Sequence, residues 1–174
     1  MKGIIIYQSR YGATEQYARW LAEATRLPML SLDRATPAIL AGYDIIILGS
    51  SVYVGKLLVS KWLDQNAGLL AQKKVLLFIV CGTTADDISQ QQEIIRNNLG
   101  RALSRSIETF FLPGRCVIAN LSWKDRIVLK IGAWLQKDPQ KKVVMNQGFN
   151  YMDQKNLTRL IAAVKHSVKE TALC

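Results

Sequence analysis

Residues 3–21, GIIIYQSRYGATEQYARWL, contain the pattern that decides the fold. The run from Gly3 to Gln8 is short and rich in isoleucine, which indicates a buried β-strand. Between Thr14 and Arg26 the apolar residues recur at helical spacing, and Glu15 stands where a helix favours negative charge. The stretch therefore predicts a buried strand, a short loop and an amphipathic helix.

The loop between this strand and helix has a hydroxyl at each end, from Ser9 and Thr14, and a glycine at Gly12. It contains neither the GxGxxG pattern of dinucleotide-binding loops nor the GxxxxGK[ST] pattern of nucleoside triphosphate sites. Backbone N–H groups at a helix start suit a phosphate dianion, and the helix dipole adds to this. Alternatively, the two hydroxyls only cap the turn and the helix. The loop alone leaves both interpretations open.

The rest of the chain continues to alternate strand and helix. Further strands are expected at residues 29–32, 44–49, 74–81 and 115–119, and further helices at 57–70, 87–104 and 151–169. Such alternation predicts a doubly wound α/β sheet of parallel strands, built as one domain over residues 1–174. Loops rich in Gly, Ser and Thr follow three of the strands, where this class of fold binds ligands.

Composition narrows the class of protein. The chain has 174 residues, 49% of them hydrophobic, which argues against a disordered chain. The longest apolar run is too short for a membrane span, and the N-terminus lacks the pattern of a signal peptide. Three cysteines without CxxC spacing and one histidine, His166, predict neither a disulfide framework nor a metal site. A reducing cytoplasm is the expected compartment.

Positive charge is concentrated in the second half of the chain. The formal net charge is +10. Residues 1–90 carry 9 basic against 7 acidic residues, whereas residues 91–174 carry 14 against 6. Such a field favours an anionic partner, which leaves nucleic acid, an acidic membrane surface or an anionic small molecule open.

Residues 120–142 interrupt the alternation and are interpreted as an insertion. One helical face would carry the apolar residues Trp123, Ile127, Ile131, Trp134 and Leu135. Basic side chains surround that face, namely Lys124, Arg126, Lys130 and Lys137. Tryptophan beside lysine and arginine suits a membrane interface with anionic headgroups. The alternatives are a helix packed on its own domain and, with least support, a nucleic-acid site.

The first loop in its wider context resembles the flavodoxin family. Eight positions over seventeen residues match that family's signature, namely Ile5, Ile6, Tyr7, Ser9, Gly12, Thr14, Ala18 and Leu21. The resemblance implies a three-layer fold with a five-stranded parallel sheet of order 2-1-3-4-5. It also implies flavin mononucleotide (FMN) as cofactor. The residues that would enclose the phosphate of FMN are Ser9, Arg10, Tyr11, Gly12, Ala13 and Thr14.

The same resemblance assigns two further loops to the flavin ring. The second loop would contribute Ser50, Ser51, Val52, Tyr53, Val54 and Gly55. Tyr53 would cover one flavin face, although it also fits an ordinary half-buried loop residue. The third loop would contribute Gly82, Thr83 and Thr84 through its backbone. Flavodoxins usually place a second aromatic residue there, and this chain has none between Phe78 and Phe110, which leaves room for a second planar molecule.

The chain resembles more closely the bacterial, menaquinone-dependent protoporphyrinogen IX dehydrogenases, a membrane-associated family with a flavodoxin-like fold. The features are the second loop, the run 115–119 (RCVIA) and a basic insertion that ends in a Lys-x-Val-Val pattern at 141–144 (KKVV). This insertion would interrupt strand five between two pieces, at 115–119 and 142–146. Tyr53 and Lys56 depart from that family's residues. The resemblance implies oxidation of protoporphyrinogen IX, or a similar reduced anionic substrate, with electrons passed through FMN to a quinone in haem biosynthesis.

In that interpretation the flavin carries the chemistry, and no catalytic side chain is expected. The residues proposed to meet substrate or partner are Lys56, Arg115, Trp123, Lys124, Arg126 and Lys130. A peripheral position on the inner face of the cytoplasmic membrane would follow. The rival interpretation is a non-enzymatic, flavodoxin-type electron carrier, although such carriers are generally acidic. The sequence leaves the oligomeric state open.

Overall fold

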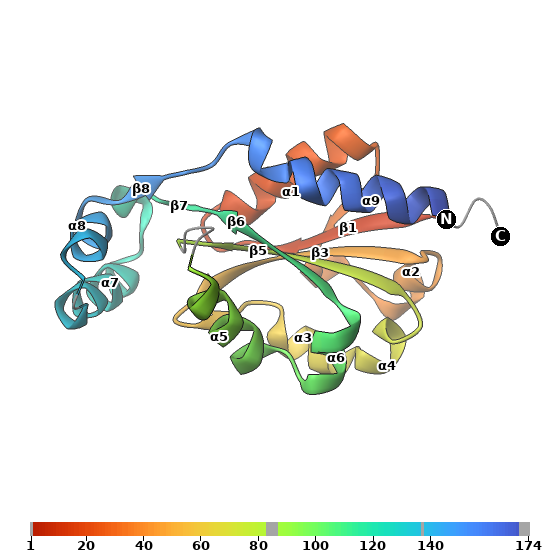
Figure 1. Cartoon of the computed structure of the whole chain (residues 1–174), viewed down its shortest axis with the longest axis horizontal. Helices are drawn as coiled ribbons and strands as arrows, with labels where there is room; N and C mark the ends of the chain where they lie inside the picture. The colour runs from red at the N-terminus through yellow and green to blue at the C-terminus, as the bar shows by residue number, and fades with distance from the viewer. Residues whose placement is uncertain (1, 83–86, 137, 171–174) are drawn as a thin grey trace.

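A central parallel sheet organises the chain in the computed structural model, which describes residues 2–82, 87–136 and 138–170 (Figure 1). Its strands are β1 (Gly3–Gln8), β2 (Met29–Ser31), β3 (Ile45–Tyr53), β5 (Lys74–Cys81) and β6 (Glu108–Pro113), in the order β2-β1-β3-β5-β6. This confirms the predicted order 2-1-3-4-5 for five strands. A two-residue strand, β4 (Lys56–Leu57), adds an antiparallel arm to the end of β3.

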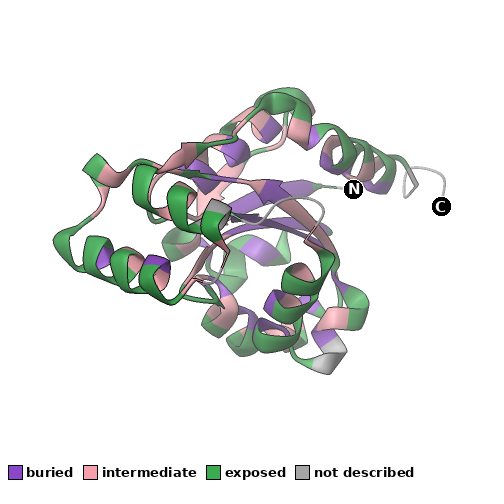
Figure 2. Ribbon diagram, turned by 60° about the vertical axis from the view of Figure 1, so that its left-hand side comes forward, coloured by how far each residue is buried: buried purple, intermediate pink, exposed green. Residues whose placement is uncertain are grey.

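Burial on both faces explains why the central strands are runs of apolar residues. In the register of the sheet, Ile5 of β1 lies beside Ile47 of β3, and Ile47 lies beside Leu76 of β5. All three side chains are fully buried, and Figure 2 shows the buried colour on the central strands of the sheet. A parallel sheet covered by helices on both sides requires this composition.

Helices cover the two faces of the sheet. On one face α1 (Ala13–Thr25) and α9 (Thr158–Glu170) pack Tyr17, Leu21 and Leu160 into the core. The other face is covered by short helices, α2 (Pro37–Ala41), α3 (Ser60–Gln65), α4 (Ala67–Leu70), α5 (Ile88–Asn98) and α6 (Arg101–Ser106). Brief 3-10 turns lie at η1 (Leu32–Arg34), η2 (Ile118–Asn120) and η3 (Gln154–Leu157).

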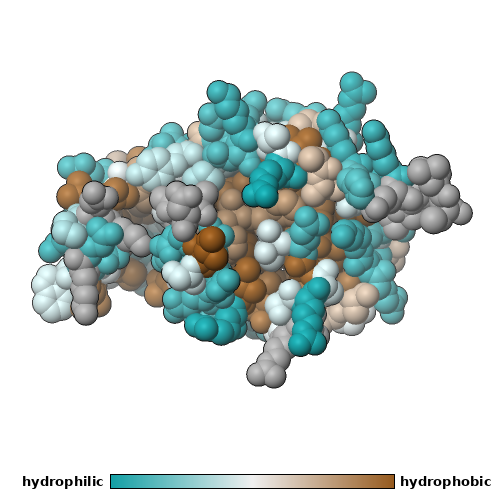
Figure 3. Space-filling model, in the orientation of Figure 1, coloured by the Kyte–Doolittle hydropathy of each residue, from teal (hydrophilic) through white to brown (hydrophobic). Residues whose placement is uncertain are grey.

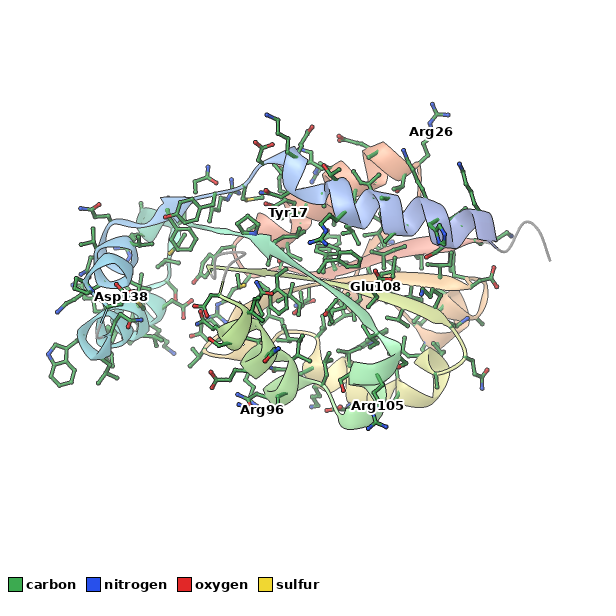
Figure 4. The ribbon with its side chains drawn as sticks, viewed as in Figure 1. Tyr17, Arg26, Arg96, Arg105, Glu108 and Asp138 are labelled. Atoms are coloured by element: carbon green, nitrogen blue, oxygen red, sulfur yellow. The ribbon has the colours of Figure 1, made fainter. Side chains whose placement is uncertain are left out.

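Tyr17 fastens α1 to the edge of the sheet near the ligand-binding end (Figure 4). Its hydroxyl donates to the Pro113 carbonyl oxygen at 2.8 Å and accepts from Asn156 Nδ2 at 3.0 Å. Burial is the main reason that the pKa of this phenol lies above its ordinary value. The hydroxyl therefore stays protonated and holds the end of β6 in place.

Four predicted elements differ from the structure. The helix expected at 151–169 begins as the 3-10 turn η3, and α9 starts only at Thr158. The expected helices at 57–70 and 87–104 are each two short helices, because residues 66 and 99–100 leave the helical conformation. The expected fifth strand at 115–119 is wrong, because only residues 115–116 are in a strand and that strand lies outside the central sheet. The fifth strand is β6, which begins at Glu108 and ends at Pro113. As an edge strand, it tolerates both a charged residue and a proline.

The insertion forms a small unit beside the sheet, at the left of Figure 1. It consists of α7 (Trp123–Leu135) and α8 (Pro139–Gln147), carried by an antiparallel ribbon of β7 (Arg115–Cys116) and β8 (Phe149–Asn150). The second piece of strand five, expected at residues 142–146, is therefore helical. Gly148 (φ +79°) allows the turn from α8 into β8, where a Cβ would meet the Cys116 carbonyl oxygen at 2.4 Å.

Candidate functional site

The first loop forms a cradle at the start of α1. Gly12 has φ +81°, a left-handed conformation, and its backbone N–H donates to Ser9 Oγ at 3.0 Å. Thr14 is fully buried, and its hydroxyl has no hydrogen-bond partner among the described residues. A buried hydroxyl without a partner is costly unless a ligand satisfies it. The cradle therefore fits a phosphate group at the start of the helix.

The second loop is an extension of β3 and not an open loop. The strand continues through Tyr53 and turns back into β4, with Val54 and Gly55 at the turn. Both turn residues have positive φ, +48° and +72°. The hydroxyl of Ser51, like that of Thr14, is buried and finds no hydrogen-bond partner in the part of the chain that the structure describes. This hairpin places Tyr53 beside the first loop.

The third loop is described only at its beginning. Cys81 and Gly82 lie at the end of β5, whereas Thr83 and Thr84 lie outside the described residues. A Cβ on Gly82 would stand 2.9 Å from Cζ of Phe149, so the ring of Phe149 lies directly against this loop. Phe149 comes from β8, at the end of the insertion, and stacks on Tyr151 with ring centroids 5.1 Å apart.

The three loops and the insertion enclose one cavity of about 390 Å³. Its polar side is formed by the three loops, with Ser9, Arg10, Tyr11, Ala13, Thr14, Ser51, Val52, Tyr53, Val54, Cys81 and Gly82 in the wall. Its apolar side comes mainly from the insertion, with Cys116, Leu121, Val128, Leu129, Gly132, Met145 and Phe149. Burial raises the pKa of the Cys116 thiol, which keeps it protonated. Ser50 and Gly55 belong to the second loop and lie next to this wall.

Asp125 of α7 joins the insertion to the first two loops. Its carboxylate is 5% exposed and accepts from Arg10 Nε and Nη2 at 2.9–3.0 Å and from the Tyr53 hydroxyl at 2.6 Å. The Tyr11 hydroxyl also donates to it. Hydrogen bonds from Tyr11, then Tyr53, then Arg10 hold the pKa of this carboxyl well below its usual range. The carboxylate is therefore charged and fully bonded inside the site.

Arg10 packs on aromatic rings as well as on Asp125. Its guanidinium carbon lies 4.0 Å from the centroid of the Tyr53 ring and 5.8 Å from that of Tyr11. The hydrogen bond to Asp125 is the main reason that the pKa of the Tyr53 phenol is raised, so it stays protonated and continues to donate. Since Arg10 covers one face of Tyr53, the opposite face is the one available for stacking.

The residues expected to meet substrate or partner are separated by the structure. Arg115 lines the cavity. Lys56 lies on the hairpin arm and donates to the Asn97 carbonyl oxygen at 3.1 Å. Trp123, Lys124, Arg126 and Lys130 lie on exposed positions of α7. The Arg126 guanidinium donates to the carbonyl oxygens of Ala119 and Leu121, which fastens the start of the helix.

The apolar face of α7 points outward and not onto the domain. Trp123 is 69% exposed and Trp134 is 76% exposed, and Ile127, Ile131 and Leu135 are exposed as well. The interpretation of a face packed on its own domain is therefore wrong for these residues. Figure 3 shows apolar and polar atoms side by side on the insertion. Among the described residues, no helix is both long and apolar enough to cross a bilayer.

Asp125 and Phe149 are site residues that the sequence did not predict. Asp125 follows Ser122 by three positions, a common helix-start pattern, and its N–H does bond to the Ser122 hydroxyl at 3.2 Å. One signal was present, because Asp125 interrupts an otherwise basic helix start. Phe149 supplies an aromatic ring at the third loop from far along the chain, so a search within that loop could not find it.

Comparison with known proteins shows a match to one protein family. A family profile described as "Flavodoxin domain" matches residues 4–142. An uncharacterized protein of Methanocaldococcus jannaschii, MJ0298, is 32% identical over 85 residues, which are 47% of this chain and 55% of that protein. The chain thus spans about half the length of this curated relative.

Two solved structures share the fold. A flavodoxin, WrbA-like protein from Agrobacterium tumefaciens has a TM-score of 0.50 at 17% identity, covering 71% of this chain and 87% of the other. Oxidised Flavodoxin 2 from Bacillus cereus has a TM-score of 0.50 at 24% identity, covering 66% and 85%. At these identities the two structures establish the fold.

Proposed function

Because this chain belongs to the flavodoxin domain family, we propose that it is an oxidoreductase that oxidises protoporphyrinogen IX to protoporphyrin IX and passes the electrons to a quinone. FMN is its cofactor, as the sequence predicted. The resemblance of its second loop, of residues 115–119 and of its basic insertion to the protoporphyrinogen IX dehydrogenases supports the choice of substrate and acceptor.

The observation that carries the proposal is the composition of the cavity. An electron carrier needs a site for FMN alone. Here the insertion adds an apolar wall of Val128, Leu129, Gly132 and Met145 to the polar loops. Apolar walls bind large planar or aliphatic molecules, which describes both a porphyrinogen ring and a quinone. The cavity thus suits a second, largely apolar molecule beside the cofactor.

Named residues would hold the cofactor. The N–H groups at the start of α1 and the hydroxyls of Ser9 and Thr14 would bind the phosphate, which would give Thr14 the partner that it does not find among the described residues. The free face of Tyr53 and the ring of Phe149 would contact the flavin ring. When bound, FMN supplies the capacity to accept hydride or electrons from a reduced substrate and to pass them on.

The exposed side of the insertion is proposed to meet an anionic membrane surface, where both quinone and porphyrinogen partition. Lys124 and Lys130 flank the exposed apolar face of α7 and suit phospholipid headgroups or the propionates of the substrate. This would place the protein at the inner face of the cytoplasmic membrane. A nucleic-acid partner has no feature of the site in its favour.

The test of the proposal is turnover by the FMN-loaded protein. We expect protoporphyrin fluorescence to rise when protoporphyrinogen IX and a menaquinone analogue are supplied without oxygen, and not when the quinone is omitted. Gly132→Leu should lower this rate about tenfold with FMN retained, because a Cβ there already stands 2.9 Å from Met145 Cε in the apolar wall. The matched control is Gly68→Leu on α4, where a Cβ meets open space.

The alternative function is a non-enzymatic electron carrier, which family membership alone favours. It predicts no porphyrin formation with any quinone, together with rapid reduction or oxidation of the bound FMN by a reductase or acceptor protein. The net charge of +10 opposes it, because carriers of this kind are generally acidic. If the folded, FMN-loaded protein shows no quinone-dependent formation of porphyrin, the electron-carrier function is favoured over the oxidase function.

A further inference from the structure

The arginine in the first loop is already bound by another partner. Arg10 makes three hydrogen bonds to the Asp125 carboxylate and lies over the Tyr53 ring. A guanidinium that is neutralised by a carboxylate and packed on a phenol gains little from turning to a second anion. The obvious cation of the phosphate loop is therefore committed to the second loop and the insertion.

A second arginine lies beside the same loop from the opposite direction. The Nη2 atom of Arg115, on β7, stands 3.5 Å from the position that a Cβ on Gly12 would occupy. Gly12 is the residue that precedes α1, so this guanidinium lies at the start of the helix that forms the cradle. Within the described part of the chain, no carboxylate forms an ion pair with Arg115.

We propose that Arg115, and not Arg10, is the cation that binds the phosphate of FMN, and that Asp125 enforces this division by holding Arg10 against Tyr53. A phosphate dianion over Gly12 would lie within reach of the Arg115 guanidinium. This guanidinium would supply the positive charge that Arg10, paired with Asp125, does not offer to the phosphate. The inference rests on FMN binding and not on the proposed substrate. Under this inference Arg115 binds the phosphate of the cofactor, whereas the sequence predicted that it would meet the substrate or a partner.

Comparison of FMN with riboflavin isolates the phosphate, because the two ligands differ only in that group. Flavin-free protein is titrated with each ligand, and the quenching of flavin fluorescence gives the dissociation constants. We expect Arg115→Gln to weaken FMN binding roughly 10- to 100-fold, the usual loss for a hydrogen bond to a charged group, and to leave riboflavin within about threefold. The loss should be smaller at high salt.

Two variants complete the test. Arg115→Lys keeps the charge and should restore part of the preference for FMN over riboflavin, which a folding defect would not do. Arg10→Gln is the matched control, and it should affect both ligands alike because Arg10 acts through Tyr53. Equal losses for FMN and riboflavin in Arg115→Gln would overturn the inference, as would a selective loss of FMN in Arg10→Gln. Unchanged FMN binding in Arg115→Gln would equally overturn it.

Discussion

Asp125 concentrates the electrostatics of the site in one side chain. Five hydrogen bonds from three residues saturate its two oxygens, and all three residues come from the loops that enclose the cofactor. Breaking such a buried, paired charge leaves its partners without compensation, which costs more than the pair itself contributes. A single carboxylate of the insertion thus determines the positions of Arg10, Tyr11 and Tyr53.

Replacement of this carboxylate should make stability less dependent on pH. The pKa of Asp125 is lower in the folded protein than in the unfolded chain, where it is about 3.9. Its contribution is therefore complete at neutral pH and is lost as the pH falls through the folded pKa. We expect urea unfolding to show a difference between the wild type and Asp125→Asn that is largest at pH 7 and narrows below about pH 4.

The control for this measurement is Asp64→Asn, which removes an exposed carboxylate of α3. It should follow the wild type over the whole pH range. A gap between wild type and Asp125→Asn that stays constant from pH 7 into the acid range would show that Asp125 acts through shape and not through its charge.

Val54 is a second residue of interest, because its backbone conformation lowers the stability of the protein. It adopts φ +48° in the turn between β3 and β4, a conformation that a β-branched residue rarely takes. Two-residue turns with both residues at positive φ favour asparagine before glycine. Val54→Asn should therefore raise the free energy of unfolding by about 1 kcal/mol, measured by urea denaturation. Val54→Thr keeps the β-branch and should give no gain, and an equal gain in both variants would refute the explanation.

At the scale of elements, burial decides what the sequence could predict. The bounds predicted for β1 and β5 match the structure, because a strand that is buried on both faces has an unbroken run of apolar residues in its sequence. β6 was missed, since an edge strand that begins with Glu108 and ends with Pro113 lacks that pattern. The convergence of the three loops could be predicted from the strand order. The hydrogen bond from Arg10 to Asp125 could not, because the two residues are 115 positions apart and no local sequence pattern indicates it.

The exposed face of α7 makes a prediction about that helix alone. Ile131→Glu combined with Trp134→Glu should weaken binding to vesicles that contain anionic lipid by roughly tenfold or more, because each side chain would otherwise bury apolar area in the interface. Vesicle co-sedimentation measures this effect. FMN affinity should not change, since neither residue lines the cavity.

Ile88→Glu is the matched control for this prediction. Ile88 lies on α5 and is 62% exposed, and its neighbours in the sequence, Asp87 and Ser89, are not basic. Its replacement should leave vesicle binding unchanged. If both variants lose binding equally, or neither does, α7 is not the membrane-binding element.

At the scale of the whole molecule, the insertion contributes to the site but not to the core. Of the residues that the structure describes between Leu112 and Met152, none belongs to the two hydrophobic clusters that flank the sheet. The insertion also lies apart from the two helical layers in Figure 1. The excess positive charge of the second half of the chain extends onto this unit. The chain thus consists of a self-contained α/β core and an attached basic unit that forms the apolar wall of the cofactor cavity.

Excision of the insertion tests this division. β7 and β8 already pair, with Cys116 opposite Phe149, so residues 117–148 can be replaced by Asn-Gly as a two-residue hairpin turn. We expect the shortened chain to unfold cooperatively in urea with the far-ultraviolet circular dichroism of an intact α/β core, because both hydrophobic clusters remain. Its affinity for FMN should fall further than that of Asp125→Asn, since it loses the apolar wall together with the carboxylate. Non-cooperative unfolding would show that the core depends on the insertion, and wild-type FMN affinity would show that the wall does not contact the cofactor.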